Sequence, residues 1–256
     1  MSDFDRNIAA ARTGYRTDQV AIDAGLRAYM IRVYNYMTAG VALTGLVAWF
    51  AFQAAGGDQI HIVGNQVTGL TAFGHAIFAS PLMWLFVLAP LGLVMLLSFG
   101  INRLSASTAL TLFFVYAGLL GLSLATIFLA YTGASITRVF FISAATFGAM
   151  SLYGYTTQRD LTGFGSFLFM GLIGLVIASL VNIFLQSSGL YWVISVVGVL
   201  IFVGLTAYDT QSIKEMYDVN DDGSVSGRKA VMGALRLYLD FINLFLMLLR
   251  LFDDRR

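Results

Sequence analysis

The chain has 256 residues, of which 58% are hydrophobic and 11% are charged, and its mean hydropathy is +0.79. Soluble domains hold about 45–50% apolar and about 25% charged residues, so this composition excludes an ordinary soluble protein and predicts one embedded in lipid. The 15 basic and 14 acidic residues give no basic surface for a nucleic acid, and the lack of cysteine excludes disulfides, thiolate metal sites and cysteine nucleophiles.

The N-terminal segment, residues 1–32, mixes basic and acidic side chains and contains no apolar run typical of a signal peptide. We predict that it is a cytosolic tail. From residue 33 onward the chain consists mainly of apolar stretches of about 20 residues, the length that a helix needs to cross a hydrocarbon core about 30 Å thick. We therefore predict one transmembrane domain over residues 33–252, followed by a short C-terminal tail, 253–256.

Seven spanning helices are predicted in this all-α integral membrane protein. The uncharged stretch 161–208 is too long for one crossing, and the turn signal Gln-Ser-Ser-Gly at 186–189 divides it in two. The longest loop, 55–81, holds both histidines of the chain and no basic residue. The predicted spans lie at about 33–54, 82–101, 107–131, 139–157, 163–186, 190–212 and 229–252.

The distribution of lysine and arginine predicts a multi-pass protein of the cell (inner) membrane with its N-terminus in the cytoplasm. Positive charge is retained on the cytosolic side. In this orientation the cytosolic segments hold five, one, one and three basic residues, whereas the outer loops hold only Arg138. The C-terminal end departs from the rule, because seven full spans place Arg250, Arg255 and Arg256 outside. The sequence leaves open whether the last helix crosses completely.

Two aspartates lie inside predicted spans. A charged side chain at the centre of a membrane helix costs about 2.5–3.5 kcal/mol on insertion scales, so such residues are candidate functional sites. Asp209 lies near the end of the sixth span and Asp240 lies midway along the last helix. A short loop joins these helices, so we expect them to pack antiparallel. Facing carboxylates in a low dielectric do not both ionise readily, so the pair would share a proton and titrate as one unit.

A second arrangement is that each aspartate is neutralised separately. Arg236 precedes Asp240 by four residues on the same helical face, and Asp209 could reach toward Lys214. At 1.5 Å per residue Asp209 lies roughly 7 Å and Asp240 roughly 16 Å from the cytosolic end, a difference that helix tilt must close for a pair to form.

Two intramembrane amides, Asn182 and Asn243, are further candidates. Their expected role is an interhelical hydrogen bond, with pore lining as the alternative.

Three runs of residues form longer motifs in the second half of the chain. They are LYLDFINLF at 237–245 followed by LLR at 248–250, YDTQ at 208–211, and SLYGYTT at 151–157 with RDL at 159–161 and FGS at 164–166. The first run is similar to the C-terminal signature of the Bax-inhibitor-one family, also called transmembrane Bax inhibitor motif proteins, and the other two match characteristic stretches of that family. The sequence therefore resembles the bacterial branch of this family.

This resemblance implies a seven-helix fold whose last helix is central and is wrapped by the other six. Members are described as pH-sensitive calcium leak channels, in which the aspartates that match Asp209 and Asp240 form the proton-sensing pair. An arginine near the end of the second span is implicated in holding the closed state, and Arg103 is the candidate here. Eukaryotic relatives restrain cell death, and some bacterial relatives are described as modulators of a membrane-bound quality-control protease.

Two other patterns in the sequence have simpler explanations. The loop 218–225 begins like an EF-hand, but its twelfth position is Lys229 instead of a glutamate, so a solvated Asp-rich turn is the expected structure. Aspartyl proteolysis would require a Gly-x-Gly-Asp motif that Asp240 lacks. Serine hydrolysis within the membrane is disfavoured because His61 and His75 both lie in the 55–81 loop.

We therefore predict a non-enzymatic, pH-sensitive calcium leak channel that works without a cofactor. Asp209 and Asp240 would sense protons and contact calcium transiently, and Arg236 or Arg103 would act as counter-ion or latch. The expected partners are the lipid bilayer, calcium ions and protons, with no nucleic acid. The alternative is a non-conducting regulator that binds a membrane-protein partner such as a protease.

Overall fold

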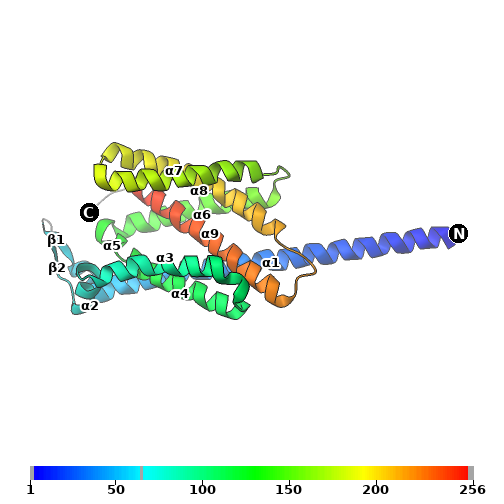
Figure 1. The fold of residues 1–256 in the computed structure, drawn as a ribbon, viewed down its shortest axis with the longest axis horizontal. Helices are drawn as coiled ribbons and strands as arrows, with labels where there is room; N and C mark the ends of the chain where they lie inside the picture. The colour runs from blue at the N-terminus through cyan, green and yellow to red at the C-terminus, as the bar shows by residue number, and fades with distance from the viewer. Residues whose placement is uncertain (1–2, 64–65, 253–256) are drawn as a thin grey trace.

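The computed structural model describes residues 3–63 and 66–252, and these residues form a bundle of long helices (Figure 1). Seven helices are long and apolar enough to cross a membrane, as predicted. The long helices are α1 (Asp3–Ala55), α3 (Leu82–Gly100), α4 (Ala106–Leu124), α6 (Gly133–Thr156), α7 (Thr162–Leu185), α8 (Ser188–Glu215) and α9 (Gly223–Leu251). The predicted C-terminal tail, with Arg255 and Arg256, lies outside the described residues.

The predicted helix boundaries agree best at the turns that the sequence signals most strongly. Gln186 ends α7 in the left-handed conformation, with φ 50°, and the Ser187 hydroxyl accepts a hydrogen bond from the Leu190 N–H to cap α8.

The first and last spans start earlier than predicted. Helix α1 continues without a break from Asp3, so the apolar span Ala24–Ala55 is one part of a 53-residue helix. Helix α9 starts at Gly223 because Asp222 caps it.

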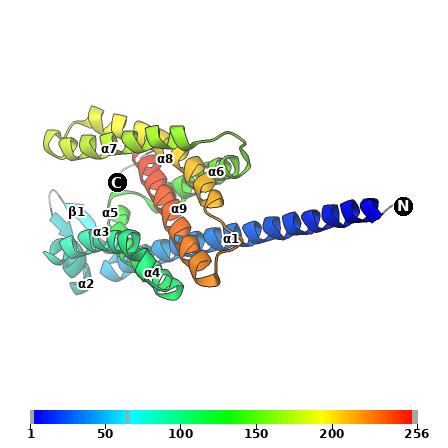
Figure 2. The same cartoon turned by 45° about the vertical axis from the view of Figure 1, so that its right-hand side comes forward.

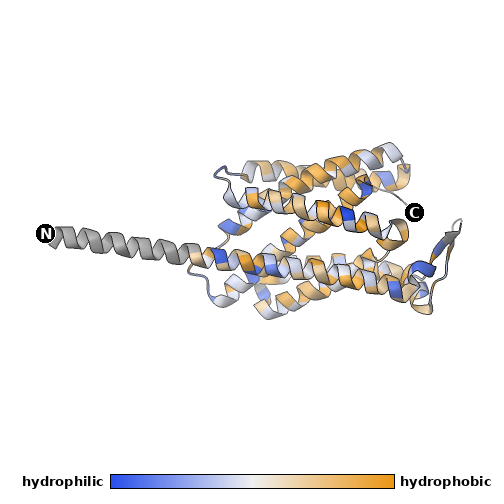
Figure 3. Ribbon diagram, turned by 180° about the vertical axis from the view of Figure 1, so that it is seen from behind, coloured by the Kyte–Doolittle hydropathy of each residue, from blue (hydrophilic) through white to orange (hydrophobic). Residues whose placement is uncertain are grey.

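The last helix occupies the centre of the bundle, as predicted. Helix α9 packs against α1, α4, α6 and α8, and Figures 1 and 2 show it crossing obliquely between these helices. Most of its length is buried, and the buried residues include the small ones Ala230, Gly233 and Ala234, so neighbouring helices approach it closely. The outer helices instead have many exposed apolar residues. Figure 3 shows that most of their ribbon has the colour of hydrophobic residues. This arrangement suits a lipid environment.

Helix α9 extends through the whole bundle. Its first residues lie near the end of the bundle where the long N-terminal part of α1 emerges, and its last residues lie near the opposite end, where α5 (Ile127–Ala130) is found (Figure 1). The charge distribution left open whether the last helix crosses the membrane completely. In the structure α9 has the length and position of a full span.

The loop between α1 and α3 is more structured than predicted. It contains a small antiparallel hairpin, with His61 paired to Thr68 across the two strands. The hairpin and the short helical turns pack on the end of α1, where Phe52, Ala55 and Ile60 form a small second core. The elements of this loop are η1 (Gly57–Gln59), β1 (His61–Val63), β2 (Gln66–Thr68), α2 (Ala72–Gly74) and η2 (His75–Ala79).

A buried hydrogen-bond cluster joins α9 to α1 and α4. The Tyr238 and Thr44 hydroxyls lie 2.6 Å apart, and the Thr44 hydroxyl also lies within 3.0 Å of two carbonyl oxygens, those of Gly40 and Ala117. The Tyr238 ring is fully buried and packs edge-to-face against Phe113. Because Thr44 has one hydroxyl proton to give to a carbonyl, Tyr238 is the natural donor to Thr44.

Replacing Tyr238 by phenylalanine is expected to lower the free energy of unfolding by about 1–2 kcal/mol, because the buried Thr44 oxygen loses its donor. Thermal unfolding in detergent measures the change. Tyr153→Phe is the matched control, because Tyr153 is 45% exposed. Equal melting temperatures for the two variants would show that the cluster does not contribute to stability.

Candidate functional site

Four consecutive residues of α8, Tyr208 to Gln211, each contact a different part of the bundle. The Tyr208 ring packs on Gly165 of α7, and the Asp209 carboxylate faces α9. The Thr210 hydroxyl lies 3.0 Å from the Ser151 hydroxyl of α6. One helical turn distributes these side chains around the helix, which explains why successive residues of one motif contact three helices.

The last residue of this motif holds the link between α6 and α7. The Gln211 side-chain oxygen accepts a hydrogen bond from the Leu161 N–H at 2.8 Å, and its amide nitrogen donates to the Arg159 carbonyl at 2.8 Å. Both backbone groups belong to the RDL run at 159–161. Two of the sequence signatures are thus two halves of one structural contact.

The two intramembrane aspartates meet between α8 and α9. Both residues line one cavity, and their carboxyl groups are close enough for the charge of one to act on the other. The Asp240 side chain is buried, with the residue 5% exposed, and its Oδ2 has no hydrogen-bond partner among the described residues. The Asp209 side chain is 17% exposed. The two carboxyl groups thus lie side by side between α8 and α9.

Arg236 lies beside this pair and forms an ion pair across the two helices. Its Nη1 lies 3.9 Å from Oδ1 of Asp209. The sequence suggested an ion pair within α9, between Arg236 and Asp240, but the structure contains the interhelical pair instead. The three charged groups thus form one cluster of two acids and one base.

The alternative in which Asp209 reaches toward Lys214 is not seen in the structure. The Lys214 ammonium donates to the Tyr155 carbonyl at 3.0 Å and lies over the Tyr155 ring, 5.3 Å from its centroid. These contacts turn the lysine toward α6. Asp209 therefore has Arg236, and not Lys214, as its basic neighbour.

The carboxyl pair lies in a cavity of about 870 Å³ between α7, α8 and α9. Its wall on the α7 side is mostly apolar, with Phe169, Leu172 and Val176 among the lining residues. The opposite side carries polar groups, and those from α8 and α9 are Tyr208, Asp209, Arg236, Asp240 and Asn243. The cavity is thus large enough for several water molecules or a hydrated cation.

The two candidate amides form hydrogen bonds within or at the end of their own helices. The Asn243 side chain lines the cavity, and its Nδ2 donates to the Leu239 carbonyl of the same helix at 2.8 Å. The Asn182 side chain caps the end of α7 by accepting from the Ser187 N–H at 3.1 Å. Among the described residues we find no interhelical hydrogen bond from either amide. Asn182 is a terminal cap because α7 ends three residues after it, at Leu185.

Arg103 is not part of the carboxyl site. It ends the short helix η3 (Ile101–Arg103), its side chain is exposed, and it is not among the residues that line the cavity. Within the described residues its side chain forms no ion pair. The latch that the resemblance implied for Arg103 is therefore not seen in this conformation.

The EF-hand-like loop uses its acidic side chains for local structure. The Asp222 carboxylate accepts from the Val225 N–H at 2.7 Å and caps α9, and Asp221 binds the Lys229 ammonium at 2.5 Å. Hydrogen bonds from Asn220 lower the pKa of Asp218. Among the described residues no group of three or more His, Asp or Glu side chains is placed to hold a metal ion.

A polar bridge across α6 was missed by the sequence reasoning. The Ser151 hydroxyl is hydrogen-bonded to the Tyr34 hydroxyl of α1 as well as to Thr210 of α8. This chain of hydroxyls connects the first helix to the helix that carries Asp209. The signal was present in the SLYGYTT run, whose first residue, Ser151, is the centre of the bridge.

The fold and this site define a polytopic α-helical membrane protein with a carboxyl pair buried beside its central helix. The family model described as "Inhibitor of apoptosis-promoting Bax1" matches residues 26–256, which include all seven spans apart from the first residues of the first. The chain belongs to this Bax inhibitor family.

Relatives in several bacteria resemble the chain over almost its whole length. The inner membrane protein YbhL of Escherichia coli K12 is 49% identical over 235 residues, which cover 91% of this chain and 94% of that protein. The protein RP147 of Rickettsia prowazekii is 47% identical over 91% of this chain and 92% of its own. A protein of Caulobacter vibrioides is 42% identical over 100% of both chains.

Proposed function

We propose that this protein is a pH-sensitive calcium leak channel of the inner membrane, gated by a proton that Asp209 and Asp240 share. The observation that carries the proposal is the meeting of these two carboxyl groups in a cavity beside the central helix. Paired carboxylates by themselves suit a divalent cation or a proton. The choice of calcium rests on the resemblance to the family.

Protonation of the pair would close the path. With one proton, one carboxyl group donates a hydrogen bond to the other, and α9 remains seated against α8. Loss of the proton leaves two like charges at close range in a poorly solvated site, which repel each other and attract a cation. The flux should therefore rise with pH. Arg236, 3.9 Å from Asp209, would act as the counter-ion that makes the ionised state accessible.

The buried oxygen of Asp240 gives independent support for proton sharing. Oδ2 of Asp240 has no hydrogen-bond partner among the described residues. A buried acceptor left without a partner costs about 1–3 kcal/mol, and more when it is charged. Ionised Asp240 would thus be strained in this conformation, which suits a closed state that opens when the proton leaves.

The same cluster also supports the alternative of a non-conducting regulator. The ion pair between Arg236 and Asp209 joins α8 to α9 and could act as a fixed structural lock. In that case the protein would act by binding another membrane protein, such as a protease. We propose the N-in orientation for both functions, because the basic residues gather at the cytosolic segments of that topology.

Calcium flux into liposomes distinguishes the two functions. The full chain is reconstituted in vesicles that contain a calcium-sensitive dye, calcium is added outside, and the initial rate is recorded from mildly acidic to mildly alkaline pH. We expect the rate to exceed that of protein-free vesicles and to increase toward alkaline pH. Absence of protein-dependent flux at every pH would overturn the channel and favour the regulator.

A further inference from the structure

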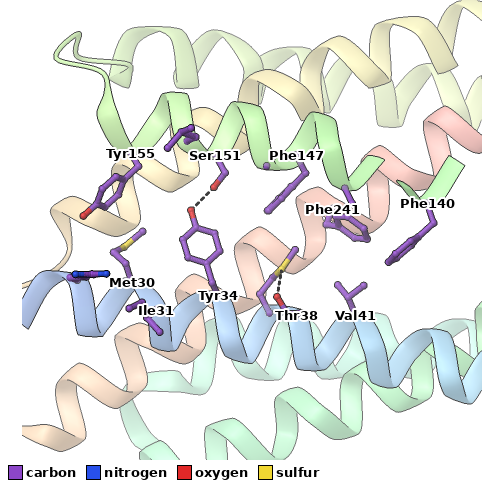
Figure 4. A pocket seen from close by; sticks show the side chains of 15 residues that line it. Met30, Ile31, Tyr34, Thr38, Val41, Phe140, Phe147, Ser151, Tyr155 and Phe241 are labelled. Atoms are coloured by element: carbon purple, nitrogen blue, oxygen red, sulfur yellow. Dashed lines mark hydrogen bonds between the residues drawn. The ribbon is translucent and has the colours of Figure 1, made fainter. Parts of the chain in front are cut away.

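A second cavity, distinct from the carboxyl site, lies between α1 and α6. Its volume is about 610 Å³, and its walls are largely apolar, with Met30, Met37, Phe147 and Phe241 among the lining residues. Figure 4 shows it as a groove with Tyr155 and Met30 near one end and Phe140 and Val41 near the other. Cavities of this size hold elongated ligands of a few dozen atoms.

The rims of the groove face the membrane. Ile31 on α1 is 49% exposed and Leu152 on α6 is 64% exposed, and both line the groove. In a membrane these side chains contact lipid, so the groove is open to lipid along its side. An unfilled apolar groove loses dispersion contacts, which makes an inserted acyl chain favourable.

The groove has the length of a lipid chain rather than of a compact ligand. It extends along α1 from Arg27 to Val41, which is about 21 Å at 1.5 Å per residue. One leaflet of the hydrocarbon core is about 15 Å thick, so the groove covers a leaflet and reaches into the headgroup region. A smaller cavity of about 100 Å³ shares Val41, Phe140 and Phe241 with the groove and continues it toward Thr44.

Positive charge is confined to one end of the groove. Among the described residues that line it, Arg27 is the sole charged one and none is acidic. The Lys214 ammonium lies over the ring of Tyr155, which lines the same end. An apolar channel with cations at its mouth complements an amphiphile with an anionic head and an apolar tail.

We propose that the groove between α1 and α6 binds an anionic phospholipid of the surrounding membrane. The Arg27 guanidinium binds the headgroup phosphate, and one acyl chain lies along the groove between Tyr34 and Phe140. Phe241 forms part of the wall and directly follows Asp240 in α9, so the bound chain packs on the central helix. This inference does not depend on ion conduction.

Native mass spectrometry of the delipidated full chain tests the proposal by titration with phosphatidylglycerol and with phosphatidylcholine of the same acyl chains. We expect wild type to bind its first phosphatidylglycerol about tenfold more tightly than phosphatidylcholine, because the choline ammonium neutralises the phosphate charge and is repelled by Arg27. Arg27→Gln should bring the two affinities to within about twofold. Arg138→Gln, which removes an exposed arginine elsewhere on α6, should behave like wild type.

A second pair of variants tests the groove itself. A Cβ at Gly148 would meet no heavy atom within 4 Å, and Gly148 lines the groove, so we expect the side chain of Gly148→Leu to fill it without a clash at Cβ. We expect at least a tenfold loss of affinity for both lipids. Gly174→Leu on α7 is the control, because its Cβ also meets nothing within 4 Å. Equal wild-type affinities for the two lipids, or unchanged binding by Gly148→Leu, would overturn the proposal.

Discussion

Replacing Asp240 by asparagine is expected to abolish the pH dependence of calcium flux through this protein. Asparagine has nearly the same shape as the protonated carboxyl group and cannot ionise, so it fixes the closed pairing with Asp209. Wild-type flux should fall by up to about tenfold for each pH unit below the transition, because proton binding follows that slope. The variant should remain at the low, acid-like rate throughout. The assay is the dye-loaded liposome measurement.

Two further variants help to show whether the effect of Asp240→Asn comes from the carboxyl pair. Asp209→Asn should also flatten the pH profile, because the proton needs both carboxyl groups to be shared. Asp160→Asn is the control: Asp160 is exposed, and asparagine keeps the acceptor for the Thr162 N–H. A flux that retains the wild-type pH profile in both intramembrane variants would remove the aspartates from the gate while leaving a channel.

Asp240→Asn should also make the protein more stable at alkaline pH. At acidic pH the wild-type pair carries a proton, so the variant and wild type should differ little in their free energy of unfolding. As pH rises, wild type must ionise a buried carboxyl group whose Oδ2 has no partner among the described residues, and the variant avoids this cost. Thermal unfolding in detergent at several pH values would reveal a difference that grows with pH.

The second large effect is expected at Gly154, where α6 and α8 are in backbone contact. A Cβ at this position would lie 2.1 Å from the Ala207 carbonyl oxygen, and real Cβ atoms essentially never approach another atom so closely. Gly154→Ala must therefore push α6 away from α8, two residues from Asp209. We expect a loss of about 3 kcal/mol in the free energy of unfolding, the upper part of the range for overpacked sites.

Gly148→Ala provides the matched comparison for Gly154→Ala on the same helix. Its Cβ would meet nothing within 4 Å, so the substitution should be neutral or stabilise the helix by up to about 1 kcal/mol. Thermal unfolding and the yield of monodisperse protein distinguish the two. If both variants unfold at the same temperature, the tight contact between α6 and α8 is not required for stability.

The seven spans and the proximity of Asp209 to Asp240 could be predicted from the sequence because both depend on strong, local signals. A hydrocarbon core requires about 20 apolar residues for each crossing, and the run 161–208 contains one clear turn signal, at 186–189. A charge in the middle of a span is equally conspicuous. Consecutive helices with a short connection pack antiparallel, which brings Asp209 and Asp240 together.

Contacts that depend on helix rotation could not be predicted. Four-residue spacing suggested that Arg236 pairs with Asp240, yet the rotation of α9 against α8 places its guanidinium beside Asp209. The sequence left open that Asp209 reaches toward Lys214, but the Lys214 ammonium donates to the Tyr155 carbonyl instead. Spacing gives the neighbours on one helix, whereas the packing angle between helices decides which of them meet.

The glycines show the same difference between what local sequence indicates and what helix packing decides. The chain has 26 glycines, and nothing in the local sequence separates Gly154, which has backbone contact with Ala207, from Gly148, which has open space around it. The hairpin at residues 61–68 was missed for a related reason. Its strands are three residues long, too short for an alternating pattern to be recognised.

The central claim, that Asp209 and Asp240 share one proton, is tested most directly by infrared spectroscopy of the protonated carboxyl stretch in reconstituted protein. We predict a protonated carboxyl band at neutral pH that disappears as the pH rises and that both Asp209→Asn and Asp240→Asn change in amplitude or frequency, whereas Asp160→Asn does not. A neutral-pH spectrum without that band, or a band that neither intramembrane variant changes, would contradict the proposed gate.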